Sequence, residues 1–259
     1  MSPCLTVAFK EIRDHLRDTR SLGSAAMYAL MGPLVIMIVS QSEAARNGGP
    51  RLLLSMMSVF ILVSAFSSGM HLALDSTAGE RERGSLVPLL LNPVSRFYLI
   101  TGKWIAVSAF TLAGLGLNLA AFTAVFEWGG VVPPGEVTEV FLLWILCGLV
   151  PLALFGAALD LLAASTCRTV KEAQARLSTV MFVPMIVGMF LVFFPGWIGR
   201  WWFAVPVVGQ QALIGAGLGG EAVSVLQAGL LGLLLTTAVA VMALVAAARG
   251  LDRDEIVAG

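Results

Sequence analysis

Six long apolar runs divide this sequence and leave few ways for the chain to fold. A helix rises about 1.5 Å per residue, so about 20 apolar residues cross a hydrocarbon core of about 30 Å. The runs lie at residues 25–41, 52–74, 104–126, 140–164, 177–196 and 222–248. Helices suit such uninterrupted segments because they satisfy their own backbone hydrogen bonds within lipid. The sequence therefore predicts an all-α integral membrane protein with six transmembrane helices.

The composition agrees with lipid serving as part of the solvent. Hydrophobic residues make up 58% of the chain and charged residues 12%, whereas a soluble domain is usually about 45–50% apolar and about 25% charged. One soluble core cannot bury that much apolar surface. We expect a single transmembrane domain over residues 1–259.

Lysine and arginine are divided unevenly between the two sides of this topology. Thirteen lie in the N-terminal segment, the second-to-third and fourth-to-fifth loops and the C-terminal tail, and three lie on the other side, at Arg46, Arg51 and Arg200. Cytoplasmic loops carry the excess of these residues, so both termini are predicted to be cytoplasmic. Lysine is rare beside arginine, which suggests a bacterial genome and hence the bacterial cytoplasmic (inner) membrane.

An amphipathic helix is predicted ahead of the first span, within residues 1–24. One helical face carries Leu5, Phe9, Ile12 and Leu16. The other positions are mostly charged and include Lys10, Glu11 and Arg13. Such a helix is expected to lie in the cytoplasmic interface with its apolar stripe among lipid headgroups. Two roles remain open for it, a surface anchor and a lever beside the first span.

Residues 75–103, between the second and third spans, contain charged residues, a glycine, leucines and a proline in an order that predicts local structure. Asp75 to Arg83 is predicted as a charged helical extension of the second span that ends at Gly84. Ser85 can cap a short helix after it. That helix would have an apolar face of Leu86, Leu89 and Leu90 and a stop at Pro93.

A charged strut followed by an amphipathic helix suits docking onto a soluble partner. The alternative is a solvated loop with ordinary positive-inside arginines. The candidate docking residues are Glu80, Arg81, Glu82, Arg83, Gly84, Ser85, Leu86, Leu89, Leu90, Pro93 and Arg96.

The segment at residues 197–221 is semi-apolar and rich in glycine. It is too broken to span the membrane. Its tryptophans at the start suit the outer interfacial belt. The rest is expected to be re-entrant or to lie flat against other helices, because unpaired backbone cannot face lipid.

Catalytic and nucleotide motifs are missing. The pair Gly102–Lys103 has neither the first glycine nor the Ser or Thr of a P-loop, and HExxH and GxSxG are absent. The cysteines Cys4, Cys147 and Cys167 form no CxxC. We expect no enzyme activity, no metal, no cofactor and no nucleic acid partner for this chain.

Few polar side chains lie within the spans. Asp160, His71 and Asp75 fall near cytoplasmic ends, where interfacial placement is expected. Asn118 falls in the middle of the third span. Asparagine there is more often interhelical glue, worth about 1 kcal/mol, than a ligand. It is the one candidate for a residue on a substrate pathway.

Four stretches of this chain resemble the type-two ABC exporter permeases, a family related to sodium-efflux and multicopper-maturation permeases. "FKEIRDHLRDTRSL" is similar to the family's N-terminal elbow helix. "ERERGSLVPLLLNPVSR…GK" is similar to its coupling segment, including Gly102 and Lys103. "CRTVKEAQ" at 167–174 resembles its second cytoplasmic loop, and "PVVGQQALI" at 206–214 resembles its segment between the fifth and sixth spans.

The resemblance implies that this chain is the transmembrane permease subunit of an ABC exporter. It implies two permease protomers, as a homodimer or a close heterodimer, and two separate ATPase subunits that bind ATP and magnesium. It also implies that residues 1–24 form the elbow helix and residues 75–103 the coupling segment. Sodium-efflux relatives often carry a large outer domain after the first span, for which residues 42–51 leave no room.

Two other functions are weighed against the exporter. An ion-gradient-driven secondary transporter would need ionisable residues along its path, and the spans are nearly bare of them. A non-transporting membrane scaffold would need no ATPase partner. Lipid, hydrophobic peptide, drug and ion all remain open as substrates.

Overall fold

The computed structural model describes residues 2–85, 95–129, 139–194, 202, 204–219 and 222–250. In chain order the helices are α1 Pro3–Arg17, α2 Thr19–Val39, α3 Glu43–Ser67, α4 Met70–Leu74, the π-helical η1 Asp75–Gly79, α5 Glu80–Glu82, α7 Arg96–Gly129, α8 Glu139–Ser165, α9 Val170–Phe193, α10 Val208–Gly219 and α11 Ala222–Gly250. The described residues include no strand, so the all-α prediction is confirmed.

Six helical segments are long and apolar enough to cross a membrane, as predicted. They are Ser21–Val39, Leu52–Glu82, Arg96–Trp128, Gly148–Ser165, Val170–Phe193 and Gly232–Gly250. The second and third are 31 and 33 residues long, or about 46 and 50 Å as helices. Both exceed a hydrocarbon core of about 30 Å. Their ends therefore have room to extend beyond the lipid.

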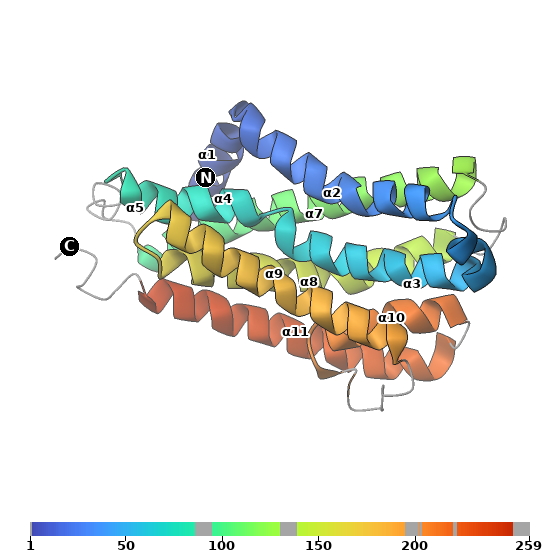
Figure 1. The fold of residues 1–259 in the computed structure, drawn as a ribbon. Helices are drawn as coiled ribbons and strands as arrows, with labels where there is room; N and C mark the ends of the chain where they lie inside the picture. The colour runs from blue at the N-terminus through green and yellow to red at the C-terminus, as the bar shows by residue number, and fades with distance from the viewer. Residues whose placement is uncertain are drawn as a thin grey trace.

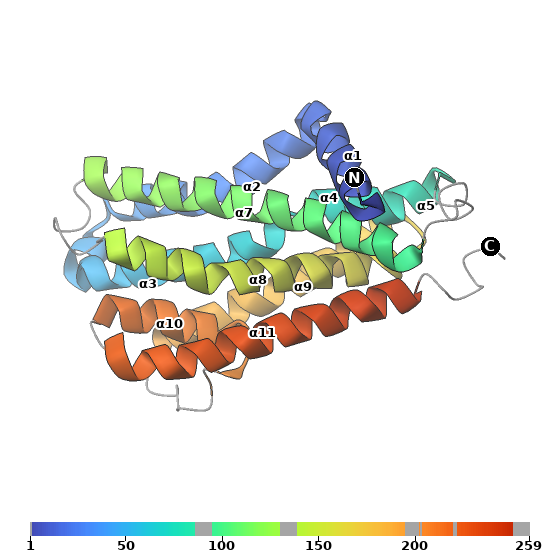
Figure 2. The same ribbon diagram turned by 180° about the vertical axis from the view of Figure 1, so that it is seen from behind.

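The spans form an elongated bundle in which α3 and α8 are internal and α2 and α9 are peripheral (Figures 1 and 2). In the most apolar part of each span, 78% of the residues are buried for the second and 22% for the first and the fifth. The largest core cluster joins α3, α7 and α8 through side chains such as Met57, Ile61, Phe122 and Leu152. The exposed faces of α2 and α9 are apolar, which suits contact with lipid.

The second span is not one continuous α-helix. It breaks between Ser67 and Met70 and then continues through one π-helical turn into α5. A Cβ at Gly69 would come within 2.3 Å of Thr111 Oγ1 on α7. The glycine therefore allows α7 to pass close to the break. The prediction that Asp75 to Arg83 extends this span as a helix is confirmed as far as Glu82.

The N-terminal helix α1 ends at Arg17, and α2 begins at Thr19, with Asp18 in an extended conformation between them. Residues 19–24 therefore belong to α2, whose membrane-spanning part begins at Ser21, and the elbow helix α1 is shorter than the predicted residues 1–24. Figure 1 shows α1 crossing the bundle near α4 and α7. A Cβ at Gly102 would come within 2.7 Å of the Cys4 carbonyl oxygen, so this glycine permits close packing of α1 on α7.

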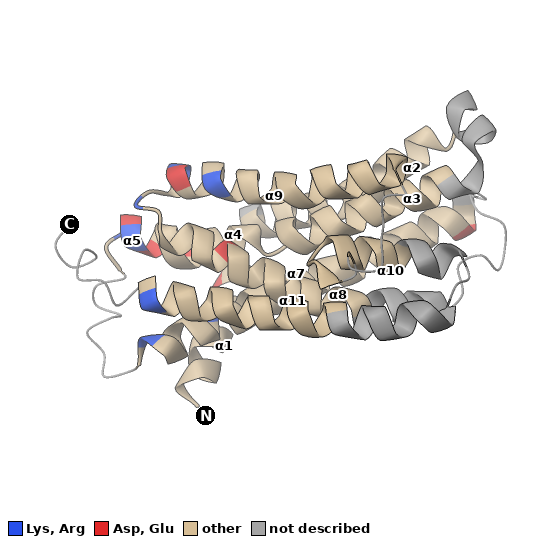
Figure 3. Cartoon of the chain, turned by 90° about the horizontal axis from the view of Figure 1, so that it is seen from below, with Lys and Arg blue, Asp and Glu red and all other residues tan. Residues whose placement is uncertain are grey.

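Most charged residues among those described gather at the end of the bundle that carries α5 and the last turn of α11 (Figure 3). This segregation is the pattern that the distribution of lysine and arginine along the sequence predicts. Asp160 on α8 is packed among neighbouring helices and is 2% exposed. Its interfacial placement stays a prediction, because burial within the protein does not give its depth in the membrane.

At the opposite end, the structure describes the helix α10 within the predicted segment 197–221. Its 12 residues are too few to span a membrane. Gln210 and Gln211 are buried: Gln210 donates to Thr236 Oγ1 on α11 at 2.8 Å, and Gln211 donates to Ser58 Oγ on α3 at 2.6 Å. The predicted packing of this segment against other helices is confirmed for α10. Trp197 and Trp201 lie outside the described residues.

Candidate functional site

A buried lysine lies where α1, the extension of the second span and α7 meet. Lys103 on α7 is 2% exposed. Its Nζ donates to Glu80 Oε2 at 2.6 Å and to Glu11 Oε1 at 3.5 Å, and it also donates to the Ser76 carbonyl oxygen. The side chains of Glu80 and Glu11 are only 9% and 8% exposed. One cation thus joins three elements that are far apart in the sequence.

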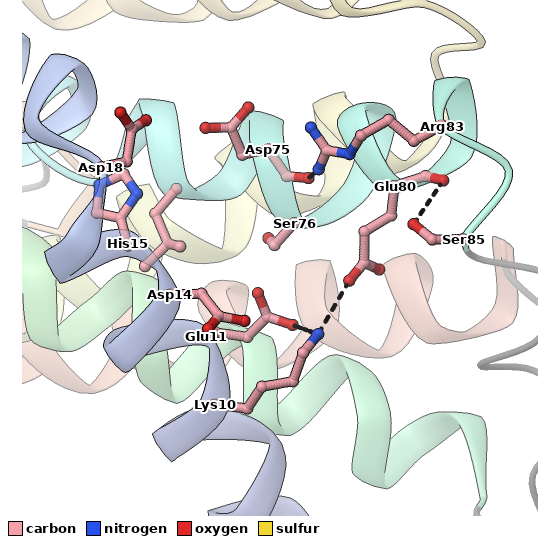
Figure 4. A pocket seen from close by; sticks show the side chains of 11 residues that line it. Lys10, Glu11, Asp14, His15, Asp18, Asp75, Ser76, Glu80, Arg83 and Ser85 are labelled. Atoms are coloured by element: carbon pink, nitrogen blue, oxygen red, sulfur yellow. Dashed lines mark hydrogen bonds and ion pairs between the residues drawn. The ribbon is translucent and has the colours of Figure 1, made fainter.

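Lys10 closes this network at the surface. Its Nζ lies 3.4 Å from Glu11 Oε1 and 3.5 Å from Glu80 Oε1, as Figure 4 shows. Burial opposes the charge of Lys10, but the carboxylates of Glu11 and Glu80 outweigh that cost and raise its pKa above the ordinary value. Two carboxylates therefore share two ammonium groups, and each ion in the cluster has an opposite charge beside it.

The local sequence explains why these groups meet. The buried residues of α1 are Ala8, Glu11 and His15, which repeat at three- and four-residue spacing and so lie on one face. The opposite face exposes Phe9 and Leu16, as predicted for a stripe toward lipid. Ile12 differs from the prediction, because it is half-buried and packs on the cluster around Leu72 and Val107.

Arg81 and Glu82 hold the loop between α8 and α9. Arg81 donates to the carbonyl oxygens of Ser165 at 2.8 Å, the last residue of α8, and of Cys167 at 2.6 Å, just after it. Glu82 accepts a hydrogen bond from the backbone N–H of Val170 at 2.6 Å, at the start of α9. A cation at a helix C-terminus and an anion at a helix N-terminus both match the helix dipole. The extension therefore clamps the segment "CRTVKEAQ".

Gly84 ends the extension as predicted. Its φ is +70°, a conformation that glycine adopts without strain. The backbone N–H of Ser85 bonds to the Glu80 carbonyl oxygen at 2.9 Å and that of Gly84 bonds to the Arg81 carbonyl oxygen at 3.0 Å, which is the Schellman arrangement. The Ser85 hydroxyl also donates to the Glu80 carbonyl oxygen, so Ser85 closes the helix before it.

The remaining predicted residues are only partly placed. Leu86, Leu89, Leu90 and Pro93 lie outside the described residues. Arg83 donates to the Asp75 carbonyl oxygen at 3.1 Å, Arg96 begins α7, and Arg13 is exposed on α1.

The charges from Glu80 to Arg83 are predicted to orient a docked partner, and this stays a prediction. Within the chain, Glu80 is engaged by Lys103, and Arg81 and Glu82 hold the α8–α9 loop.

Asn118, the candidate pathway residue, is fully buried. Its Nδ2 donates to the Ala29 carbonyl oxygen on α2 at 2.6 Å. This bond joins the first and third spans, as interhelical glue would, and a place for Asn118 on a substrate pathway stays a prediction.

The sequence places Lys103 in the coupling-segment pattern but does not predict it as a site residue. The available signal was a lysine followed directly by an apolar run, because such a residue must find carboxylates if it is buried.

A pocket of about 280 Å³ lies beside the network, between α1 and the extension (Figure 4). It is lined by Lys10, Glu11, Asp14, His15, Asp18, Leu72, Asp75, Ser76, Glu80, Arg83 and Ser85. We call it the elbow pocket. Within the described part of the chain, no three His, Cys, Asp or Glu side chains are grouped as metal ligands.

Comparison with known proteins gives two findings. The profile of the ABC-2 family transporter proteins matches residues 5–198. Over 189 residues the chain is 33% identical to the ABC transporter permease protein NatB of Bacillus subtilis (strain 168), an alignment that covers 68% of this chain and 47% of NatB. The chain thus spans about half the length of this curated relative.

Proposed function

The chain belongs to the ABC-2 family of transporter proteins, and from this membership we propose that it is the permease subunit of an ATP-driven exporter. In this proposal residues 1–259 form one permease domain in the bacterial inner membrane, with both termini in the cytoplasm. Two protomers enclose the substrate pathway. Separate ATPase subunits, two per complex, bind ATP and magnesium and dock on residues 80–96.

The observation that carries the proposal is the burial of Lys103 between Glu80 and Glu11. A displacement of the coupling segment cannot leave this site unchanged, because Glu80, the acid closest to the Lys103 ammonium, would move away and leave Glu11, at 3.5 Å, as its remaining acid. Separating a buried ion pair in this way is costly. The elements therefore move together, and α7 and α1 follow the coupling segment.

The clamp on the α8–α9 loop extends the same argument to a second loop. Arg81 and Glu82 follow Glu80 directly and hold the backbone at Cys167 and Val170. A force applied to residues 80–96 thus reaches α1 and α7 through Glu80, α8 through Arg81 and α9 through Glu82. This arrangement suits a permease whose spans respond to ATPase closure beneath them.

The decisive experiment is co-purification of the candidate ATPase, together with measurement of transport-coupled ATP hydrolysis. Leu89→Asp combined with Leu90→Asp should abolish association and transport while leaving membrane insertion intact, because neither residue lies in a span. Asp252→Asn combined with Asp254→Asn in the tail is the control and should change neither. Normal association and coupling in the double aspartate variant would refute docking at this loop.

A secondary transporter is the second candidate, because one observation favours it. Asp160 is 2% exposed, and its Oδ2 has no hydrogen-bond partner. A buried ionisable group within a span often marks a proton or ion path. Transport that persists without any ATPase, follows an imposed proton gradient and is lost in Asp160→Asn would support this candidate over the exporter.

A further inference from the structure

The exposed side of α1 carries an apolar stripe and a cationic stripe next to each other. The apolar stripe consists of the exposed side chains of Leu5, Phe9 and Leu16. The cationic stripe consists of the exposed residues Lys10, Arg13 and Arg17. Phe9 and Arg13 are four residues apart and are therefore neighbours on the helix surface. The two stripes thus adjoin each other, on the side of α1 that faces away from the bundle.

The two arginines of the cationic stripe are not neutralised within the chain. They are four residues apart and so lie one turn from each other on the same face. Among the described residues, neither Arg13 nor Arg17 forms an ion pair. Lys10 differs, because its Nζ lies 3.4 Å from Glu11 Oε1 and 3.5 Å from Glu80 Oε1. The unpaired positive charge of α1 is therefore concentrated at Arg13 and Arg17.

An open groove of about 430 Å³ runs along this side of α1. Its lining comes from α1 and consists of Thr6, Phe9, Lys10, Arg13, Asp14 and Arg17. Three of these six residues are cations and one, Asp14, is an acid, so the lining carries two net positive charges. The groove therefore favours an anion that can also contact the ring of Phe9.

The direction of α1 brings this groove to the surface of the membrane. The spans run along the bundle, and α1 crosses the bundle at the end where most of the described charged residues gather (Figures 1 and 3). A helix that crosses the spans lies along the bilayer surface, with its apolar stripe toward the acyl chains. The adjoining cations then reach the phosphate level, because long basic side chains extend their charged ends from the apolar boundary to the headgroups.

We propose that the groove on α1 binds the headgroup of an anionic phospholipid, with Arg13 and Arg17 at its phosphate and Phe9 beside its acyl chains. Arginine suits this role because its planar guanidinium donates paired hydrogen bonds to phosphate oxygens. A soluble anion would neutralise the arginines but leave the apolar stripe uncovered, so the adjoining stripes favour a lipid. This inference goes beyond the proposed exporter function, because it requires neither ATP nor a second protomer.

The test compares phosphatidylglycerol, which has a net negative charge, with phosphatidylcholine of the same acyl chains, which has none. Each lipid is titrated into the purified full-length protein in a neutral detergent, and bound lipid is measured by native mass spectrometry. One cation near an anionic headgroup contributes about fivefold to binding, so the two arginines should give phosphatidylglycerol a preference of about thirtyfold. Equal binding of the two lipids would overturn the proposal.

A double variant locates the site. Arg13→Gln combined with Arg17→Gln should bring the binding of phosphatidylglycerol close to that of phosphatidylcholine. The matched control is Arg168→Gln combined with Lys171→Gln, which removes two exposed cations outside the groove and should keep the preference. If the control loses the preference equally, the lipid responds to the overall positive charge of the protein, and the proposal fails.

Asp14→Asn gives a result that a damaged protein cannot mimic. It removes the carboxylate from the groove, so phosphatidylglycerol should bind about fivefold more tightly, since one charge near the headgroup is worth about that factor. Binding of phosphatidylcholine should stay the same. Unchanged binding of phosphatidylglycerol would mean that its headgroup does not lie in the groove, whether or not the arginine variant folds.

A competition experiment separates a lipid from a soluble phosphate. Glycerol 3-phosphate has a phosphate but no acyl chains, so at equal concentration it should not displace phosphatidylglycerol from the protein. Displacement would identify a soluble phosphate as the occupant and would overturn the lipid proposal. None of these measurements involves ATP, so the failure of this proposal is separable from the failure of the proposed exporter function.

Discussion

The two ends of the bundle are both held by buried polar networks, but the networks differ in kind. At the end with α5, ions join α1, the extension of the second span and α7 through Lys103, Glu80 and Glu11. At the other end, neutral amides join α10 to α11 and α3 through Gln210 and Gln211. Figure 1 shows that α5 and α10 lie at opposite ends of the molecule.

The two networks differ in the free energy that is lost when one of their interactions breaks. A buried ion that loses its partner leaves an uncompensated charge, which costs several kcal/mol of stability. A neutral amide that loses one hydrogen bond costs only about 1 kcal/mol. The ionic end therefore resists separation of its elements and can carry force between them. The amide end fixes α10 but tolerates small rearrangements.

Removing the central cation should have the largest effect. Lys103→Met leaves Glu80 and Glu11 buried with only Lys10 beside them and should destabilise the protein by about 3–5 kcal/mol. The measurement is the thermal unfolding midpoint in detergent.

The rescue variant Lys103→Met with Glu80→Gln and Glu11→Gln should recover most of this loss, because no buried charge remains unpaired. If Lys103→Met lowers stability no more than Gln211→Leu, the variant described last below, the contrast between the two ends is contradicted.

The second-largest effect is expected from crowding the contact between α1 and α7. Gly102→Ala places a Cβ about 2.7 Å from the Cys4 carbonyl oxygen, so α1 must shift. Overpacking of this kind costs about 1–3 kcal/mol. Faster proteolysis within residues 1–18 of the purified protein would report the loosened helix.

The control is Gly23→Ala on α2, where a Cβ meets nothing within 4 Å. It should leave proteolysis unchanged and gain up to about 1 kcal/mol from helix propensity. Equal proteolysis of the two variants would show that Gly102 is not needed for docking of α1.

Among the residues that the structure describes, each end has one with positive φ, and these two residues sharpen the comparison. Gly84 at +70° carries no strain, but Val207 at 72° does, and its backbone N–H is held by Gln210 Oε1 at 2.7 Å. Gly84→Val should cost about 1–2 kcal/mol, because a side chain is disfavoured in this conformation.

Gly84→Asn should cost less, because asparagine tolerates the left-handed region. Coupled ATP hydrolysis and the unfolding midpoint should fall in the order wild type, Gly84→Asn, Gly84→Val. Equal values for the two variants would remove backbone strain as the reason for a glycine here.

The smallest effect is expected at the amide end. Gln211→Leu removes the hydrogen bond to Ser58 Oγ, but Ser58 still donates to the Ser55 carbonyl oxygen at 2.6 Å. The loss should be about 0.5–1.5 kcal/mol, again read from the unfolding midpoint. A loss as large as that of Lys103→Met would mean that neutral and ionic networks hold this bundle equally.

Some of the candidate site could be predicted from the sequence. The charged extension from Asp75 and its end at Gly84 follow from local signals, because helix termination depends on the few residues around it. The partners of Arg81 could not be predicted in this way. They are carbonyl oxygens more than 80 residues further along the chain, and no local pattern marks which loop will lie beside it.

The sequence by itself determined the spans, the division of charge between the two ends and the amphipathic helix at the N-terminus. These depend on the transfer of side chains between water and lipid, which is a property of each segment. Only the tertiary structure decided that Glu11, Glu80 and Lys103 form one cluster, that Asp160 is buried and that His15 faces the elbow pocket with an unpaired nitrogen. Those facts depend on how helices cross, and crossing is set by close contacts such as those at Gly69 and Gly102, which join residues that the sequence keeps far apart.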